Sequence, residues 1–389
     1  MREIRVAIVG AAGWMGQAHT MGYRIQKVIF GSEPAVPVLH SVTDVDADVA
    51  RELASRYDAH GSGTDWRAAI ADPAVDLVDI CLPNNMHFEV ALAAIEAGKH
   101  VYCEKPLTMT AAESKTLADA ADAKGVVTMI GHNFPRNPAH GIARDFIQRG
   151  EIGRVVHFRA SMHVDFLADP DIPFMWRCDR EEAGTGAVGD IASHIFSLAQ
   201  YLIGDAESLV ADMEIVTRSR PVLEGFNYGA QQKVADDAPR KEVTTDDIVT
   251  LLCRFAGGGM GTIDVSRVAT GQKHAQNYEL YGTKGALRFN YDHVNRIQVY
   301  RVGDPPGDQG FKSIDASPEH GRYGAFYPVA NFGLGYNEYK AIEIRELMEA
   351  VASGTPAWPT FRDGWKIMQI VDACVESSRT RRWVDVSDF

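Results

Sequence analysis

The sequence lacks a long run of basic residues, and its 52 acidic residues outnumber the 39 lysines and arginines. The formal net charge is −13. A nucleic-acid-binding protein needs a basic face to neutralise phosphates, so this balance argues against nucleic acid and anionic membranes as partners. It does not exclude an anionic cofactor, because backbone N–H groups hold phosphate without basic side chains.

Cysteine is scarce and scattered, and no two cysteines form a C-x-x-C pair. The five residues are Cys81, Cys103, Cys178, Cys253 and Cys374. This pattern predicts neither a disulfide scaffold nor a structural zinc site, and it favours a reducing compartment. No H-E-x-x-H or G-x-S-x-G signature occurs, so we expect no metal and no acyl-transfer nucleophile.

Long hydrophobic runs are also missing. No stretch of 18 apolar residues occurs, and the N-terminal sequence MREIRVAIVGAAG is too short in apolar residues to form the core of a signal peptide. The sequence therefore predicts a soluble, cytoplasmic protein without a membrane segment.

The first third of the sequence alternates short apolar runs with helical patterns. The runs are rich in β-branched residues and show no polar alternation, as expected for strands that are buried on both faces of a sheet. Strands alternating with helices at this spacing predict an α/β fold with a doubly wound parallel sheet. The predicted strands are 4–9, 38–43, 77–82, 100–103 and 126–130.

The pattern changes near residue 131. Longer runs with period-two alternation follow, and they predict a second, α+β domain with an open, mainly antiparallel sheet. We place the boundary between residues 131 and 132, which gives domains 1–131 and 132–389. Long loops are predicted over 221–241 and 303–330, and helices over 338–352 and 364–378. The period-two runs are 154–163, 209–217, 249–255, 261–267, 277–281, 286–291 and 296–300.

A glycine-rich turn, G-A-A-G-W-M-G, separates the first strand from the first helix. Such a turn is typical of dinucleotide binding, because small residues let the backbone approach a pyrophosphate at the helix N-terminus. The alternative is a turn whose glycines serve only tight packing. We expect the cofactor to contact Gly10, Ala12, Gly13, Trp14, Met15 and Gly16.

Asp44 ends the second predicted strand, where a carboxylate accepts both ribose hydroxyls of NAD and disfavours the 2′-phosphate of NADP. The alternative is that Asp44 caps the next helix, a role for which Asp46 competes. The interval from Gly16 to Asp44 exceeds the usual one of about 20 residues, so we predict an insertion over 21–37.

Several ordered blocks resemble those of the glucose–fructose oxidoreductase / inositol dehydrogenase (Gfo/Idh/MocA) family. The resemblance spans nearly the whole chain. The long interval before Asp44, the segment P-F-M-W-R and the pair Gly335-Tyr336 are most similar to the levoglucosan dehydrogenases and related sugar and inositol dehydrogenases of this family. The blocks are 82–87, 97–107, 131–134 with Arg136 and Pro138, 176–177, 186–194, and 361–364 with Ser377.

The resemblance implies a Rossmann NAD-binding domain, then a substrate-binding and oligomerisation domain. It implies hydride transfer from a secondary hydroxyl of a sugar or cyclitol to NAD. Lys105 would stabilise the developing alkoxide or share the role of base, His194 would take the proton, and Asp190 would orient the imidazole or hold a substrate hydroxyl. Ala192 departs from the glycine common in the family, and this methyl group narrows the expected pocket. Further cofactor contacts are predicted at Pro83, Asn84, His87, Glu104, Lys105, Asn133, Trp176 and Arg177.

Polar side chains and an aromatic wall are typical of sugar sites, and on this basis we select candidate substrate contacts. Taken singly, each candidate has a structural alternative: a solvated lysine, a helix-capping aspartate, a core histidine or an exposed loop pair. The selected residues are Lys105, Asn133, Arg159, His163, Asp165, Asp190, His194 and Tyr336.

Two other functions remain open at this point. Some relatives of the family retain NAD and hydrolyse glycosides without net oxidation, and other proteins of this fold are NAD-dependent sensors without turnover. The Lys105, Asp190 and His194 set favours a free-cofactor dehydrogenase. We also expect a homodimer or homotetramer that associates through the second sheet.

Overall fold

The computed structural model describes residues 2–223, 235 and 237–389. The chain divides into two compact units that are discontinuous in sequence. Unit 1 contains residues 1–141 and 316–366, and unit 2 contains residues 142–315 and 367–389. The predicted boundary falls between 131 and 132, whereas unit 1 also includes a late segment of the chain, because that segment carries a helix that packs on the first helix of the sheet.

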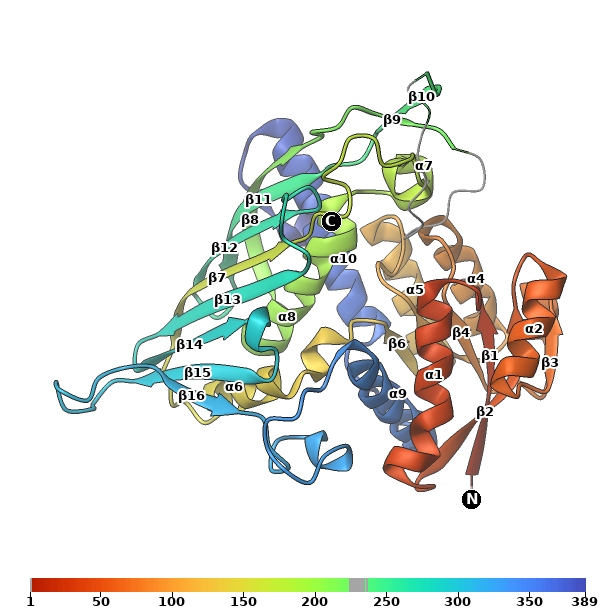
Figure 1. Cartoon of the computed structure of the whole chain (residues 1–389), viewed down its shortest axis with the longest axis horizontal. Coiled ribbons are helices and arrows are strands. Elements are labelled where there is room, and N and C mark those ends of the chain that lie inside the picture. Colours follow the sequence, from red (N-terminus) through yellow and green to blue (C-terminus); the bar gives the residue numbers. More distant parts are fainter. Residues whose placement is uncertain (1, 224–234, 236) are drawn as a thin grey trace. The chain divides into compact units, whose positions relative to one another are not determined.

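Unit 1 is built on a six-stranded sheet in the order β3-β2-β1-β4-β5-β6 (Figure 1). All of its strand pairs are parallel. This is the order of a dinucleotide-binding Rossmann sheet, with its topological switch between β1 and β4. The predicted parallel α/β half is confirmed, although the sequence did not reveal β3. The strands are β1 (Arg2–Val9), β2 (Ala35–Thr43), β3 (Gly61–Gly63), β4 (Leu77–Ile80), β5 (His100–Cys103) and β6 (Thr128–Ile130).

Helices cover both faces of this sheet, and each face has its own apolar core. Ile4, Val6 and Ile8 of β1 belong to one core, whereas Ala7 and Val9 belong to the other. Burial on both faces explains why the strands lack polar alternation. The helical elements of unit 1 are α1 (Trp14–Phe30), α2 (Ala47–Tyr57), α3 (Trp66–Ala71), α4 (Asn84–Glu96), α5 (Ala111–Lys124), η1 (Phe134–Arg136), η5 (Tyr323–Ala325), α9 (Tyr336–Ser353), and the starts of α6 (Pro138–Gln148) and α10 (Phe361–Thr380).

The long interval between the glycine turn and Asp44 contains no separate inserted element. Instead, α1 runs for 17 residues and β2 for nine, with only the short segment 31–34 between them. The residues of the predicted insertion, 21–37, thus form the later part of α1, the segment 31–34 and the start of β2. Gln26 in this part of α1 donates a hydrogen bond to the Ala341 carbonyl of α9.

Unit 2 is built on a nine-stranded sheet in the order β16-β15-β14-β13-β7-β12-β11-β8-β17 (Figure 1). Its neighbouring strands are antiparallel except for β7 and β12. The predicted mainly antiparallel sheet is confirmed. The strands are β7 (Val155–His163), β8 (Ala206–Glu214), β11 (Ile248–Phe255), β12 (Met260–Ser266), β13 (Ala275–Gly282), β14 (Gly285–Asn290), β15 (Arg296–Arg301), β16 (Lys312–Asp315) and β17 (Val384–Asp385).

One face of this sheet is covered and the other is more accessible. Phe158, Ala160 and Met162 of β7 are buried on the face that contacts α8. Arg159 and His163 alternate with them and therefore lie on the opposite face. We call this second face the outer face of the sheet. The helical elements of unit 2 are η2 (Trp176–Cys178), α7 (Arg180–Ala183), the π-helix η3 (Val188–Ala192), α8 (Ser193–Ile203), η4 (Tyr291–His293), η6 (Val386–Asp388), and the larger parts of α6 and α10.

The two predicted loops contain short regular elements. The ends of the first loop pair as an antiparallel ribbon of β9 (Ser219–Pro221) and β10 (Arg240–Glu242), while residues 224–234 and 236 lie outside the described part of the chain. The second loop contains β16 and η5. No helix in the described residues has the length and apolar character required to cross a bilayer.

Candidate functional site

The glycine turn connects β1 to the N-terminus of α1. Gly10 has a φ of 88°, and a Cβ there would lie 2.5 Å from the Cys81 carbonyl oxygen. A Cβ on Gly16 would lie 2.4 Å from the Gly10 carbonyl oxygen. Packing within the turn thus requires both glycines. This finding supports the alternative offered by the sequence for these two positions, without excluding cofactor contact.

Gly13 differs from these two glycines. The atom nearest to a Cβ added at Gly13 would be the Gly10 carbonyl oxygen, at 3.8 Å, so packing does not require a glycine at this position. Gly13 is the N-cap of α1, whose first turn has no acidic residue and no side-chain cap. A helix N-terminus with open backbone in front of it fits a pyrophosphate.

Asp44 faces this turn from the end of β2. One carboxylate oxygen accepts the Ala12 N–H at 2.9 Å, and the other accepts the Val45 N–H at 2.9 Å. Asp46 caps α2 by accepting the N–H groups of Asp48 and Val49. The capping alternative for Asp44 is therefore wrong. The Asp44 carboxylate is held beside the glycine turn, where a ribose would lie, and its contact with ribose stays a prediction.

Tyr336 lies at the start of α9 and joins the glycine turn to the segment after β6. Its ring stacks on Trp14, with centroids 5.2 Å apart, and its hydroxyl donates to the Met15 sulfur at 3.3 Å. Asn133 donates its side-chain amide to the Tyr336 carbonyl at 3.3 Å. The ring of Trp14 is 63% exposed, which is rare for so large an apolar side chain. Residues predicted separately for cofactor and substrate thus form one local surface in unit 1.

The segment after β4 begins α4 with Pro83 as its N-cap and Asn84 as its first residue. His87 is fully buried one turn later, and burial lowers its pKa. Its ring nitrogens lie 2.8 Å from the Pro106 carbonyl oxygen and 2.9 Å from that of Leu82. His87 therefore holds the segments after β4 and β5 together. Direct cofactor contacts by Pro83, Asn84 and His87 stay predictions.

Glu104 and Lys105 directly follow β5, near the switch point of the sheet. Glu104 is 4% exposed, and its carboxylate accepts hydrogen bonds from the Lys340 ammonium and from the Lys105 N–H, while one oxygen lies 2.9 Å from the His19 ring. Burial by itself would raise the pKa of Glu104, but Lys340 and His19 hold it well below its usual range. Glu104 is thus a buried anion with protein partners, and a direct contact with the cofactor stays a prediction.

The interactions of Glu104 continue into a buried cluster, which we call the Lys340 network: His19, Asp79, Tyr102, Glu104, Lys340 and Glu343. Both ring nitrogens of His19 lie near carboxylate oxygens, those of Asp79 and Glu104. Burial would lower the pKa of His19, yet the charge of Asp79 raises it overall. Since carboxylates only accept, this geometry suits an imidazolium with two N–H donors.

Sequence reasoning did not find this network. A signal was present, because Lys340 occupies a position of the apolar stripe that continues with Ile344, Leu347 and Val351. A lysine at such a position is buried only when it has anionic partners. Those partners lie far away in the sequence, and only the fold brings them to α9.

One group of possible metal ligands occurs among the described residues: His19, Asp79 and Cys81, with ligand atoms within 4.8 Å of one another. Hydrogen bonds between these groups account for their proximity. Burial raises the pKa of the Cys81 thiol well above its usual value, which disfavours the thiolate that binds metals. The expectation of no metal stays a prediction.

In unit 2, Asp190 and His194 flank a change of helix type. Residues 188–192 form a π-helix, and α8 begins at Ser193. The turn that carries Asp190 is therefore wider than a turn of a regular α-helix. π-Helical turns are rare and occur frequently at functional sites. Asp190 pairs with the Arg177 guanidinium at 3.4 Å, and His194 is 7% exposed.

Asp190, His194 and Arg177 therefore form a local group in unit 2, next to Trp176, over which the Arg177 guanidinium lies at 4.3 Å from the ring centroid. Lys105 belongs to unit 1. The convergence of Lys105 with Asp190 and His194 stays a prediction.

Two predicted substrate residues, Arg159 and His163, alternate with the buried residues of β7 and lie on the outer face of the sheet. Arg159 pairs with Glu279 at 3.6 Å, and His163 pairs with Asp264 at 2.9 Å. Their contact with substrate stays a prediction.

Asp165 follows β7 and is engaged by the loop after β12. It accepts hydrogen bonds from the Lys273 ammonium at 2.8 Å and from the Gly271 N–H at 3.2 Å. The Lys273 bond lowers the pKa of Asp165. These bonds give Asp165 a role in loop structure, and its contact with substrate stays a prediction.

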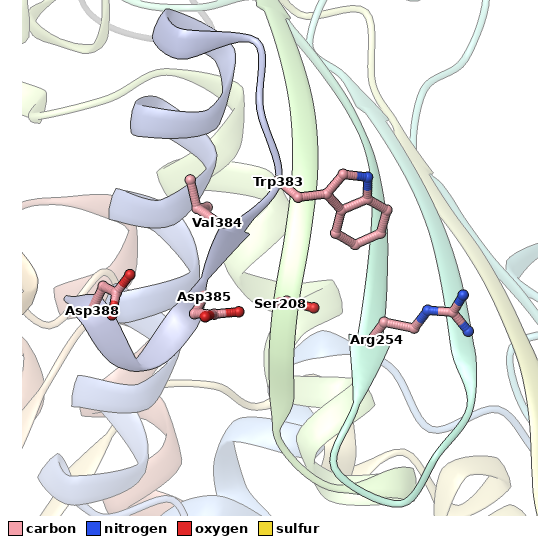
Figure 2. A pocket seen from close by; sticks show the side chains of 6 residues that line it. All are labelled: Ser208, Arg254, Trp383, Val384, Asp385 and Asp388. Carbon is pink, nitrogen blue, oxygen red and sulfur yellow. The ribbon is translucent and has the colours of Figure 1, made fainter.

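A groove of about 610 Å³ lies at the β17 edge of the second sheet, outside the predicted site. Figure 2 shows the Trp383 ring and the Arg254 side chain extending in the same direction, with Ser208 and Asp385 below Trp383. Arg254, Ser208 and Asp385 lie side by side on neighbouring strands. The groove contains no candidate cofactor, catalytic or substrate residue, so its size does not identify it as the active site.

Comparison with protein families matches both halves of the chain. Residues 4–132 match the family described as "Oxidoreductase family, NAD-binding Rossmann fold". Residues 141–288 match the GFO/IDH/MocA C-terminal domain. The cofactor predicted from the glycine turn is thus NAD, and the chain is an oxidoreductase.

Curated relatives extend the match to full length. Levoglucosan dehydrogenase of Pseudarthrobacter phenanthrenivorans is 37% identical over 386 residues, covering 99% of each chain. Myo-inositol 2-dehydrogenase of Thermotoga maritima is 27% identical, covering 90% of this chain and 92% of the relative.

Solved structures agree with this similarity. A levoglucosan dehydrogenase in complex with NADH and L-sorbose has a TM-score of 0.93 at 37% identity, covering 99% of both chains. A levoglucosan dehydrogenase in complex with NADH and levoglucosan has a TM-score of 0.91 at 36% identity, again covering 99% of both chains. With its Rossmann sheet, its open mixed sheet and both family domains, the chain belongs to the GFO/IDH/MocA family of NAD-binding oxidoreductases.

Proposed function

We propose that the protein is an NAD-dependent dehydrogenase that oxidises a secondary hydroxyl of a sugar or cyclitol to a ketone. The observation that carries this proposal is the full-length similarity to levoglucosan dehydrogenase, including relatives solved with NADH and a sugar ligand. The substrate classes to test are anhydrosugars such as levoglucosan, inositols and glucosides.

NAD, when bound, accepts the hydride from the carbon that carries the reacting hydroxyl. Gly13 and the start of α1 hold the pyrophosphate in this proposal, and Asp44 holds the ribose. Tyr336 and Trp14 present an aromatic surface beside the turn. The remaining proposed cofactor residues contact NAD directly or hold the segments that do. They are Pro83, Asn84, His87, Glu104, Asn133, Trp176 and Arg177.

Lys105 is the group proposed to stabilise negative charge on the reacting oxygen. It follows β5 beside the switch point, the edge at which parallel α/β sheets bind their ligands. His194 takes the hydroxyl proton, and Asp190 orients the imidazole or holds a neighbouring hydroxyl. The other proposed substrate contacts are Asn133, Arg159, His163, Asp165 and Tyr336.

The catalytic assignment is tested by Lys105→Ala and His194→Ala. We expect each variant to lose at least about a thousandfold in the rate of NADH formation, since a positioned acid–base group contributes about 10²–10⁴-fold. The affinity for NADH, measured by fluorescence titration, should change by less than about threefold. Near-normal turnover in both variants would refute the assignment.

Two alternative functions predict different products. A redox-neutral glycosidase releases an aglycone from a glycoside without net NADH, and a sensor binds NADH but turns over no polyol. An absorbance screen at the NADH band against levoglucosan, inositols, glucose isomers and methyl glycosides, with chromatography of the products, separates all three.

We further propose three organisational features. Residues 1–131 act as the NAD-binding domain, and 132–389 act in substrate binding and oligomerisation. Copies associate as a dimer or tetramer through the outer face, where Leu252 and Met260 are 41% and 38% exposed. The enzyme acts in the cytoplasm. Light scattering of the wild type and of Leu252→Asp tests the association.

A further inference from the structure

Lys340 is a fully buried ammonium on α9, one helical turn after Tyr336. Its Nζ atom donates to Glu104 at 2.8 Å, to Glu343 at 2.9 Å and to the Tyr102 hydroxyl at 2.9 Å. Three acceptors match the three hydrogens of an ammonium group. Burial would lower the pKa of Lys340, but the charges of Glu104 and Glu343 raise it. Lys340 is therefore held as a cation.

Glu104 connects this cation to Lys105. One Glu104 oxygen accepts from Lys340, and the other accepts the backbone N–H of Lys105 at 3.1 Å. The orientation of the carboxylate thus fixes the direction in which the chain leaves β5 and carries Lys105. Because one carboxylate binds both groups, a change at Lys340 reaches Lys105 through a single side chain.

The backbone and a ring pair pack closely around this carboxylate. A Cβ on Gly131 would lie 2.6 Å from the Glu104 oxygen and 3.1 Å from the Lys340 nitrogen. On the other side, the His19 ring stacks on Tyr102 with centroids 4.7 Å apart. A glycine is thus needed at 131 so that the backbone can approach the Lys340–Glu104 pair closely.

We propose that Lys340 is a positioning residue for Lys105, acting through Glu104. This inference rests on the proposed function, in which Lys105 contacts the reacting oxygen. It also explains why a charged side chain occupies the apolar stripe of α9: the ammonium neutralises Glu104 where water does not reach. Lys340 itself is fully buried and carries out no chemistry.

Replacing Lys340 by Met removes a positive charge and leaves two buried carboxylates without their common partner. The segment carrying Lys105 loses a fixed acceptor, and the local charge becomes more negative. More negative surroundings favour the protonated form of a lysine. Titratable groups from every neighbouring element surround Lys340. They are the network members His19, Asp79, Tyr102, Glu104 and Glu343, and outside the network Tyr23 of α1, Cys81 after β4 and His132 after β6.

The test compares Lys340→Met with a matched control, Glu343→Gln. Both changes lie in the Lys340 network on α9, but Lys340 bonds Glu104 directly, whereas Glu343 bonds Tyr102 and Lys340. Both variants should lower the melting temperature. We expect Lys340→Met to lose at least about tenfold in kcat, with NADH affinity within about threefold. The alkaline limb of its kcat profile should move to higher pH, because the cationic form of Lys105 that stabilises the reacting oxygen persists to higher pH. Glu343→Gln should retain kcat within about threefold and keep the wild-type limb.

A second readout does not depend on turnover. Trace acetylation of Lys105 by acetic anhydride, quantified by mass spectrometry across pH, reports the fraction of unprotonated amine. Its midpoint should move to higher pH in Lys340→Met. Glu104→Gln removes the negative charge of the carboxylate that joins Lys340 to Lys105. The acetylation midpoint of Lys105 should then move to lower pH. This variant tests the coupling if Lys340→Met does not fold.

The outcomes separate the two proposals. If the wild type oxidises no polyol but the acetylation midpoints move as expected, the proposed function fails and the coupling of Lys340 to Lys105 stands. Unchanged midpoints in the folded variants overturn the coupling. A proportional loss of kcat in Lys340→Met and Glu343→Gln, following only their melting temperatures, reduces Lys340 to a structural residue.

Discussion

Each unit of the molecule buries a cluster of charged side chains, and the two clusters are built differently. In unit 1, the Lys340 network joins side chains to side chains, and every charged member depends on another charged member. In unit 2, Arg267 and Asp247 form a pair whose side chains are both 0% exposed, and most of their other bonds go to the backbone.

The backbone bonds in unit 2 connect loops. Arg267 donates to the carbonyl oxygens of Arg177 and Thr245, while Asp247 accepts the N–H groups of Val216 and Thr217. Backbone dipoles cannot change their charge, so this arrangement fixes loop geometry over a wide pH range. The Arg177 loop also pairs with Asp190, which extends this fixed geometry to a predicted catalytic residue.

This difference between the two charged clusters indicates in which unit a change of protonation affects activity. In a cluster of ionisable groups, a change at one member alters the groups bonded directly to it, since their interactions are strong at low dielectric. A pair anchored in backbone amides responds mainly through stability. We therefore expect unit 1 to carry the pH-sensitive coupling and unit 2 to carry rigid support.

The largest stability effect is expected for Arg267→Met. Removing one partner of a buried ion pair costs about 3–5 kcal/mol, because the remaining charge stays buried. Urea unfolding should show this loss, while the alkaline limb of the kcat profile keeps its midpoint. The comparison between the units breaks down if Arg267→Met moves this limb as far as Lys340→Met does.

Acid should destabilise the protein through His132 and His140 of unit 1. Burial lowers the pKa of each from 6.5 to about 3. The unfolded chain therefore binds more protons below pH 6.5, and stability falls as the pH drops from there towards 3. We expect a loss of roughly 1–2 kcal/mol per histidine between pH 7 and pH 5.

His19 has the opposite sign but does not offset this loss. Its pKa is raised, so its stabilising contribution is complete below pH 6.5 and is lost only at higher pH. Urea unfolding at the two pH values, with the wild type and His140→Gln, measures the effect. An equal acid sensitivity in His140→Gln would exclude His140 as a source.

The smallest stability effect is expected for Asp44→Ala. The Asp44 carboxylate accepts hydrogen bonds from the backbone N–H groups of Ala12 and Val45. Because Asp44 is half-buried, we expect a cost of about 1 kcal/mol. NADH binding should weaken and discrimination against NADPH should decrease. The matched control is Asp46→Ala, which removes the α2 cap at a similar cost and should leave the cofactor preference intact. If Asp44→Ala and Asp46→Ala have the same ratio of NADH affinity to NADPH affinity, Asp44 does not bind the ribose.

The sequence predicted the candidate site unevenly. It predicted the glycine turn between the first strand and the first helix, because a short motif records that edge of a parallel sheet. The roles assigned to Asp44, Lys105, Arg159 and His163 stay predictions. Period-two alternation separates two faces of a strand without showing which face a helix covers. The π-helix at Asp190 also escaped prediction, since its helical pattern differs little from that of an α-helix over five residues.

The sequence by itself determined the alternation of strands and helices in the first half, apart from β3, the open sheet in the second, and the ordered blocks that place the chain in its family. These properties follow from local periodicity and from residues close together in the chain. Only the tertiary structure decided that Lys340 meets Glu104, 236 positions away, and that Tyr336 stacks on Trp14. Such contacts depend on how α9 packs against the Rossmann sheet, because the burial of a charge becomes favourable only after distant partners have been brought beside it.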